Sequence, residues 1–372
     1  MEPEPTPEVP RGVVRFYNFL PEGNPFLDDV LAGLSQLQKR ISPRYFHDER
    51  GSQLFVAACE QPECYLIRAE IAILRDNLAA IVQFIGPGAE LIELRTGIGV
   101  QTALLVEQLR PLVYVPIDID GRMLEAASRD LAKLFPWLNI SGMRADFSRP
   151  LALPEFVGLP IRKKVIFLPG SVIGGFTPDE ALDILRNARQ LAGTGDVLLA
   201  GVDLKKEGKT VVAAYSDANG INAGLHLNLL ARINRELGGD FQPRRFAYHA
   251  FHDQAKGCVT MVLASLYSQF AHVGARRFDF ARNETIDTGT AYQYSQAEFQ
   301  ALARHAGFGS QTVWTDAAQK HNDALVKRQQ VMQDAWKAYG NNAPSDDKAF
   351  AEGWMKARAD ALRKAGMDVI FE

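Results

Sequence analysis

The chain has 372 residues, of which 47% are hydrophobic and 23% charged, and this composition excludes a disordered protein, a collagen-like repeat and a disulfide scaffold. Lys and Arg number 41 against 44 Asp and Glu, so the net charge of −3 gives no attraction for nucleic acid or an anionic membrane. The length suits two domains or one large domain with appendages. Three Cys without a CxxC pair favour a reducing compartment, so we expect a cytoplasmic protein without a metal site.

The first segment, residues 1–24, begins with MEPEPTPEVPRG and is acidic and rich in proline. It has neither the order of a signal peptide nor the amphipathic pattern of a transit sequence. We therefore expect a loose tail. No stretch of the chain approaches the roughly 18 apolar residues of a membrane-spanning helix, so the expected partner is a small soluble molecule.

Helical spacing of apolar residues appears early in the chain. Residues 26–40 and 68–84 both show it and are predicted to be helices. The segment between them, residues 41–67, is dense in Pro, Gly and aromatic residues, which favours a compact cap over a regular element.

Four short apolar runs follow and are separated by helical stretches such as 121–134 and 178–192. The runs are ELIELRTG (90–97), YVPIDID (114–120), KKVIFLPGS (163–171) and DVLLAGVDL (196–204). Strands that alternate with helices at this spacing predict an α/β fold with a doubly wound parallel sheet.

The remaining chain leaves this alternation. Residues 209–237 are predicted to be helical, and residues 260–273 and 275–294 to be antiparallel strands, before a helix at 295–306. Residues 317–365 are polar and helical, with a break at GNNAPSDD that predicts a helical hairpin. The last residues, 367–372, read as a strand.

Candidate ligand-binding residues lie where the predicted parallel strands end, because ligands of doubly wound sheets bind at that edge. The turn TGIG (96–99) is an ordinary strand-to-helix turn or a ligand loop, since it lacks the P-loop and dinucleotide patterns. Asp118 can accept both hydroxyls of a ribose, although it can also act as a strand-end cap. Asp146 beside Phe147 offers an acceptor and an aromatic edge that suit adenine. Together these positions predict an adenosyl cofactor.

Longer stretches show that the chain resembles the S-adenosylmethionine-dependent histidine Nα-methyltransferases of ergothioneine biosynthesis, from about residue 25 to 316. The resemblance is carried by RYFHDERGSQLF (44–55), PECYLIRAE (62–70), YVPIDID (114–120), ADF (145–147), FLPGSVIGGFTPDEA (167–181), GDVLLAGVDLKK (195–206), VVAAYSDANGINAGLHLNLLARINRELGGDF (211–241) and VWTD (313–316). It implies a Rossmann-like methyltransferase core at 86–205 and a smaller α+β substrate domain formed by 25–85 and 206–294. Residues 295–372 would return to the core, with the hairpin 317–365 as an insertion.

The resemblance implies S-adenosylmethionine, or a related adenosyl ligand, as cofactor. Asp118 would hold the ribose, Asp146 and Phe147 would contact adenine, and Gly97 and Gly170 would lie in the cofactor loops. The methionine side departs from the family at three positions. A glycine, a lysine and a tyrosine of the family are replaced here by Arg95, Gln101 and Cys64. An arginine at this tight turn adds a cation near the sulfonium and implies an unfavourable φ.

The substrate side departs further from the family. Tyr215, which would contact the substrate carboxylate, and Met261 are kept. Four other family residues, an asparagine, the glutamate and serine that grip the imidazole, and a tyrosine near the cap helix, are replaced by Gly175, Gly289, Ala291 and His47. A polar site that loses its partners disfavours the polar ligand, so we expect a bulkier or more apolar substrate than histidine.

Two functions remain open. The chain is a methyltransferase for a small amine or an amino-acid-like molecule, with no catalytic residue assigned, or its fold has lost methyl transfer and serves as a pseudoenzyme, a binding subunit or an enzyme of different chemistry. The insertion 317–365 is either a solvated ornament or a lid or protein-partner surface.

Overall fold

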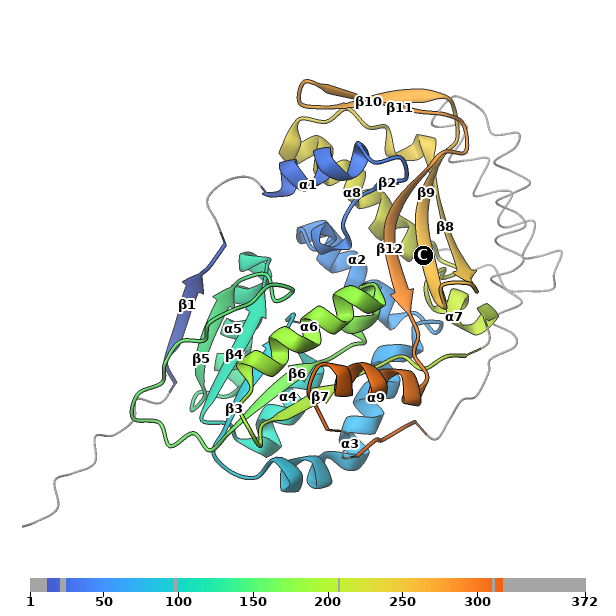
Figure 1. Ribbon diagram of the computed structural model, residues 1–372. Helices are drawn as coiled ribbons and strands as arrows, with labels where there is room; N and C mark the ends of the chain where they lie inside the picture. The colour runs from blue at the N-terminus through green and yellow to red at the C-terminus, as the bar shows by residue number, and fades with distance from the viewer. Residues whose placement is uncertain (1–11, 21–24, 97–98, 207, 310–311, 317–372) are drawn as a thin grey trace, which may run out of the picture. The chain divides into compact units, whose positions relative to one another are not determined.

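The structure is a computed structural model, and it describes residues 12–20, 25–96, 99–206, 208–309 and 312–316 (Figure 1). The chain divides into two compact units. Among the described residues, the first contains those within 12–20, 66–205 and 291–316, and the second contains those within 25–65 and 206–290.

A six-stranded parallel sheet forms the centre of the first unit. Its strand order is β1 (Val14–Asn18), β5 (Asn139–Arg144), β4 (Val113–Asp118), β3 (Ala89–Leu94), β6 (Lys163–Leu168) and β7 (Val197–Ala200). The chain runs outward from β3 in one direction to β4 and β5, and in the other to β6 and β7. The predicted α/β fold with a doubly wound sheet is therefore confirmed, and its switch point lies between β3 and β6.

Strand β1 corrects one expectation. Residues 14–18 were predicted to lie in a loose tail, whereas they pair in parallel with residues 140–144 of β5. Gly142 makes this possible, because a Cβ there would lie 2.7 Å from the ring of Phe16. The partner strand is remote in sequence, so the local composition of the tail carries no sign of the pairing.

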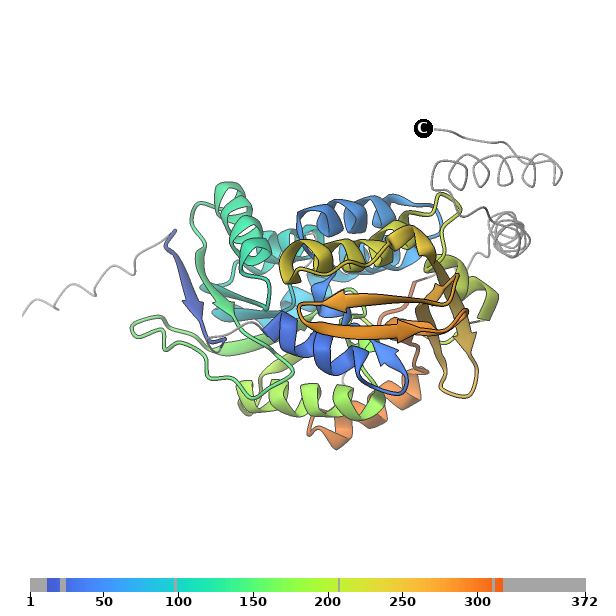
Figure 2. The same cartoon turned by 90° about the horizontal axis from the view of Figure 1, so that it is seen from above.

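Helices cover both faces of the sheet. They are α3 (Tyr65–Ile85), α4 (Val100–Leu109), α5 (Gly121–Leu134), α6 (Pro178–Leu191) and α9 (Gln296–His305). Buried side chains of α3, α4 and α5 share one cluster with β3, β4 and β6, and Figure 2 shows α6 on the opposite face from α5. Because α3 buries Leu74, Ile81 and Ile85 in this cluster, it belongs to the first unit, whereas the sequence had grouped residues 25–85 together.

The second unit combines helices with strands. Its helices are α1 (Pro25–Leu34), α2 (Glu49–Glu60), α7 (Gly208–Ala214) and α8 (Ile221–Leu237), with short 3-10 turns at Pro43–Tyr45 and Pro243–Arg245. One sheet has the order β2 (Lys39–Arg40), β12 (Thr285–Tyr292), β9 (Cys258–Ser265) and β8 (Phe246–Asp253). In this sheet, β8 and β9 pair antiparallel and β2 pairs in parallel with β12. A hairpin of β10 (Gln269–Val273) and β11 (Arg276–Phe280) contacts α8 through β10.

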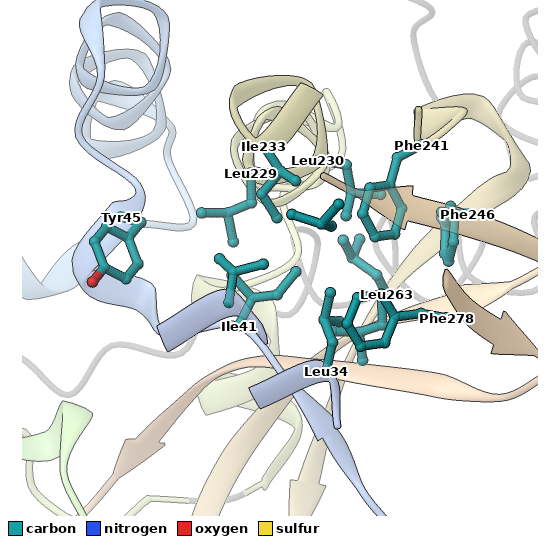
Figure 3. Close-up of a cluster of buried hydrophobic side chains, with 14 of the residues drawn as sticks. Leu34, Ile41, Tyr45, Leu229, Leu230, Ile233, Phe241, Phe246, Leu263 and Phe278 are labelled. Carbon is teal, nitrogen blue, oxygen red and sulfur yellow. The ribbon is translucent and has the colours of Figure 1, made fainter. Parts of the chain in front are cut away.

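The core of the second unit forms around α8. Figure 3 shows Leu229, Leu230 and Ile233 of this helix facing aromatic and aliphatic side chains from the strands and from α1. Leu229, Leu230 and Ile233 are all fully buried. Removing this much apolar surface from water is the main stabilising contribution, at roughly 1.5 to 3 kcal/mol for each large side chain.

Helix α2 corrects a second expectation. The segment between the first two predicted helices was expected to be an irregular cap, but residues 49–60 form a helix. Asp48 starts it, because its Oδ1 accepts a hydrogen bond from the backbone N–H of Gly51 at 2.6 Å. Pro43, Tyr45 and Phe46 lie before this cap, whereas Phe55 lies inside the helix and Pro62 follows it.

Two further predictions, the hairpin 317–365 and the strand 367–372, lie outside the described residues. Within the described part of the chain, no helix has both the length and the apolar character that crossing a bilayer requires.

Candidate cofactor and acceptor site

Four loops of the first unit begin at the same edge of its sheet, where the strands end. Arg95 follows β3, Asp118 ends β4, Asp146 follows β5, and Gly170 follows β6. Carboxyl ends of parallel strands meet at one edge, so residues far apart in sequence gather there. We call these four loops the cofactor edge.

Asp118 is the most buried acid of the cofactor edge, with 9% of its surface exposed. Its Oδ1 accepts a hydrogen bond from the N–H of Asp120 at 2.9 Å, and its Oδ2 accepts one from the N–H of Thr96 at 3.0 Å. Burial raises the pKa of Asp118, while the Asp120 N–H and the Arg95 guanidinium oppose that shift. Each carboxylate oxygen keeps a second lone pair, which a ribose hydroxyl can use.

Asp146 is held by its own loop. Its Oδ1 accepts hydrogen bonds from the backbone N–H of Ser148 at 3.0 Å and from the Ser148 hydroxyl at 2.6 Å. The neighbouring Phe147 packs edge-on against Phe176 with ring centroids 6.0 Å apart. This aromatic pair adds an apolar surface beside a fixed carboxylate, and Phe176 is a residue that the sequence had not indicated.

Arg95 adopts the left-handed conformation that the sequence implied, with φ of 73°. Its backbone N–H donates to the carbonyl of Ile117 at 2.9 Å, which fixes the turn to β4. A residue with a Cβ in this region carries roughly 1 to 2 kcal/mol of strain. Gly97, the next predicted cofactor residue, lies outside the described residues.

Glu70 of α3 joins the cofactor edge without having been predicted. Its Oε2 accepts a hydrogen bond from the N–H of Gly170 at 2.7 Å, and its carboxylate also bonds the side chain of Gln101. A Cβ on Gly201 would lie 2.4 Å from Glu70 Oε1, so the glycine admits the carboxylate. Burial raises the pKa of Glu70. An acid on an amphipathic helix gives no sequence signal for such a role.

The cofactor edge fits an adenosyl group. Asp118 offers acceptors for the ribose, and Thr96 Oγ1 is a buried hydroxyl without a hydrogen-bond partner among the described residues. Beside Gly170, whose φ is 67°, a Cβ would meet nothing within 4 Å, so the turn leaves open space for a ligand. Gln101 stands where the resemblance implies a lysine, and its side chain bonds Glu70.

The predicted acceptor residues divide between the units. Gly175 and Ala291 belong to the first unit. Gly175 ends the 3-10 turn Val172–Gly175, and a Cβ there would meet nothing within 4 Å. Ala291 is buried in β12, and its carbonyl accepts a hydrogen bond from Gln293 at 2.6 Å.

Tyr215, Met261 and Gly289 lie in the second unit and are connected there by two further residues. The Tyr248 hydroxyl donates to the carbonyl of Tyr215 at 2.5 Å, and the Tyr248 ring lies 4.4 Å from the ring of His226. A Cβ on Gly289 would lie 3.3 Å from the Met261 methyl and 4.0 Å from His226 Cε1. We call Gly289, Met261, His226, Tyr248 and Thr288 the Gly289 cluster.

Two other predicted positions lie elsewhere in the second unit. His47 packs edge-on against Phe55 with ring centroids 5.1 Å apart. Cys64 is half-buried just before α3, and its N–H donates to the carbonyl of Gln61 at 3.0 Å. In the described part of the chain, no three His, Cys, Asp or Glu side chains gather as a metal ion requires.

Known proteins are similar to this chain over most of its length. Residues 26–328 match the family described as "Histidine-specific methyltransferase, SAM-dependent". A histidine N-alpha-methyltransferase of Mycolicibacterium smegmatis is 33% identical over 306 residues, which cover 81% of this chain and 94% of that protein. The protein of the same name from Mycobacterium tuberculosis is 32% identical and covers 78% of this chain and 91% of its own length.

A more distant relative carries a different name. The 4-dimethylallyltryptophan N-methyltransferase of Claviceps purpurea is 23% identical over 318 residues, which cover 78% of this chain and 91% of that protein. The family match spans well over half of the chain, and S-adenosylmethionine is the cofactor of that family. The chain therefore belongs to the histidine-specific, S-adenosylmethionine-dependent methyltransferases.

Proposed function

We propose that this chain transfers a methyl group from S-adenosylmethionine to the amine nitrogen of a small amino-acid-like molecule that is bulkier or more apolar than histidine. The observation that carries this proposal is the Gly289 cluster. The resemblance implies that Gly289 replaces the family's imidazole-binding glutamate, and the Met261 methyl lies 3.3 Å from the place of a Cβ on Gly289. An imidazole would find no carboxylate at this position.

The residues of the cofactor edge support the first half of the reaction. When bound, S-adenosylmethionine supplies a methyl group on a positively charged sulfur. Asp118 would hold the ribose through its two carboxylate oxygens, and Phe147 with Phe176 would shield one side of the base. Such contacts fix the orientation of the methyl group, and orientation can supply a large part of the rate enhancement of an in-line displacement.

The acceptor requires an unprotonated amine. Its nitrogen lone pair forms the new N–C bond while the C–S bond breaks, and the product ammonium then releases a proton to water. Tyr215 would hold the carboxylate of an amino-acid acceptor, as the family resemblance implies, and the bond from Tyr248 to its carbonyl fixes the backbone at this residue. Excluding water around the amine strengthens each of these interactions.

The test is turnover with a panel of amines. We expect purified protein with S-adenosylmethionine to form S-adenosylhomocysteine and an N-methylated aromatic amino acid, both detected by mass spectrometry. Methylation of histidine at an equal or greater rate would contradict the proposed acceptor class.

Arg95 favours a second candidate, a fold that binds an adenosyl ligand without methyl transfer. Its left-handed backbone and its side chain occupy the turn where the family has a glycine. Calorimetry separates the two candidates, because tight binding of S-adenosylmethionine without turnover of any amine would support this second function.

A further inference from the structure

His226 of α8 is a buried polar side chain in a largely apolar setting. Its side chain lies within the second unit and is 2% exposed. Phe46 packs edge-on against the imidazole at 4.7 Å between ring centroids, and Tyr248 lies against it at 4.4 Å. Aromatic packing from two residues fixes the ring in a single orientation.

The hydrogen bonds of His226 define which ring nitrogen carries its proton. Nδ1 lies 2.6 Å from the Thr288 hydroxyl oxygen, and this hydroxyl lies 3.1 Å from the carbonyl oxygen of Met261. A carbonyl can only accept, so Thr288 donates its proton to Met261. Both contacts are then hydrogen bonds only if His226 donates from Nδ1.

The remaining nitrogen is therefore an acceptor. Burial lowers the pKa of His226 to about 3, so the imidazole is neutral and its single proton is on Nδ1. Nε2 carries a lone pair and has no hydrogen-bond partner among the described residues. This lone pair can accept a hydrogen bond from a donor on a bound ligand.

The imidazole of His226 lies beside residues that were predicted to bind the methyl-accepting substrate. Cε1, the ring atom between Nδ1 and Nε2, lies 4.0 Å from the place of a Cβ on Gly289. Met261 lies on the same side of Gly289, and Tyr248 joins the ring to Tyr215. The lone pair thus belongs to the Gly289 cluster.

We propose that His226 Nε2 determines specificity by accepting a hydrogen bond from a ring N–H on an aromatic amino-acid acceptor. This inference rests on the proposed function and names its substrate class, an amino acid whose side chain carries an indole-like donor. An indole has one N–H donor and no ring acceptor, so it matches the single lone pair. A neutral imidazole also carries a ring acceptor, for which Gly289 and Met261 offer no donor.

The test compares two ligands that differ at one ring atom. L-tryptophan and 3-(3-benzothienyl)-L-alanine have nearly the same shape, but sulfur replaces the N–H in the second. Calorimetry in the presence of S-adenosylhomocysteine should show that the wild-type protein binds L-tryptophan about tenfold more tightly, as expected for one buried hydrogen bond. Equal affinity for the two ligands would overturn the proposal.

Two variants separate recognition from packing. His226→Phe keeps an aromatic ring but removes the acceptor, so the tenfold preference should disappear. Phe46→Leu changes the packing against the ring and keeps the acceptor, so both ligands should weaken together and the preference should remain. A preference that survives His226→Phe contradicts the proposal. If that variant does not fold, the wild-type comparison decides alone.

Failure of this inference differs from failure of the proposed function. If neither ring ligand binds, the indole-like class is wrong, whereas transfer to another amine would leave the methyltransferase function intact. If S-adenosylmethionine itself does not bind, the proposed function fails first.

Discussion

The cofactor edge and the Gly289 cluster use buried polar groups in opposite ways. At the cofactor edge, the carboxylates of Asp118 and Glu70 accept hydrogen bonds from backbone N–H groups of neighbouring loops. In the Gly289 cluster, the buried polar groups are the neutral His226 and the Thr288 hydroxyl, surrounded by apolar contacts. Under the proposed function, the region that would bind the cofactor holds charged acceptors, while the region that would bind the acceptor molecule is more apolar.

The largest predicted effect is the loss of cofactor affinity caused by a substitution at Asp118. Asp118→Asn replaces one acceptor oxygen by a donor that faces a backbone N–H and weakens both ribose contacts. Hydrogen bonds to charged groups contribute about 1.5 to 3 kcal/mol each, so we expect affinity for S-adenosylmethionine to fall about 100-fold or more. Calorimetry measures the loss, and Asp130→Asn on the exposed face of α5 is the matched control. Unchanged affinity in Asp118→Asn would contradict the role of the cofactor edge.

His226 makes the second unit sensitive to acid. Its folded pKa of about 3 lies below the ordinary value of 6.5, so its stabilising neutral form is complete above pH 6.5 and is lost as the pH falls toward 3. From pH 7 to pH 4 this group should lower the free energy of unfolding by about 3 kcal/mol.

The variant His226→Phe should lack that decrease. Urea unfolding at the two pH values measures it, and His305→Gln, an exposed histidine of the first unit, should behave like the wild type. Equal acid sensitivity of wild type and His226→Phe would refute the neutral, buried imidazole.

Glu90 gives the first unit a pH dependence of stability opposite to that of His226. This residue of β3 is 2% exposed, and burial raises its pKa to about 7, with Lys164 opposing the shift. A carboxyl group with a raised pKa stabilises the fold when protonated, and this contribution is lost as the pH rises from 4.5 to 7.

Glu90→Gln mimics the protonated form at every pH. Its advantage over the wild type should grow by about 2 kcal/mol between pH 4.5 and pH 7. Thermal and urea unfolding at both values provide the measurement. An advantage that does not change with pH means that Glu90 is ionised in the fold.

The smallest predicted effect is a difference in stability between two variants at Arg95. Arg95→Gly and Arg95→Ala both remove the guanidinium, but only glycine adopts the left-handed conformation without strain. We expect Arg95→Gly to be more stable than Arg95→Ala by about 1 kcal/mol, which unfolding measurements can resolve. Equal stabilities would show that the turn relaxes when the side chain is removed.

The sequence predicted the centre of the first unit because β3, β4, β6 and β7 are continuous apolar runs. Strand β5, NISGMR, was missed because it contains Asn139, Ser141 and Gly142, residues with low strand propensity, and it is a strand only through pairing with β1 and β4. Tertiary pairing of this kind leaves no local pattern.

The site shows the same division. The place of Asp118 at the end of a strand could be predicted from the apolar run that precedes it, whereas its cofactor role stays a prediction. His226 could not, because a histidine at apolar spacing in a helix reads as an ordinary core residue. Its role depends on Thr288 and Gly289, which approach it from a strand more than sixty positions away in sequence.

The ratio of kcat/KM for L-tryptophan to that for L-histidine, measured in one preparation with saturating S-adenosylmethionine, tests the central claim most directly. The structure predicts a ratio well above one, because the Gly289 cluster offers an acceptor for an indole N–H and no partner for the second nitrogen of an imidazole. A ratio below one would contradict the account.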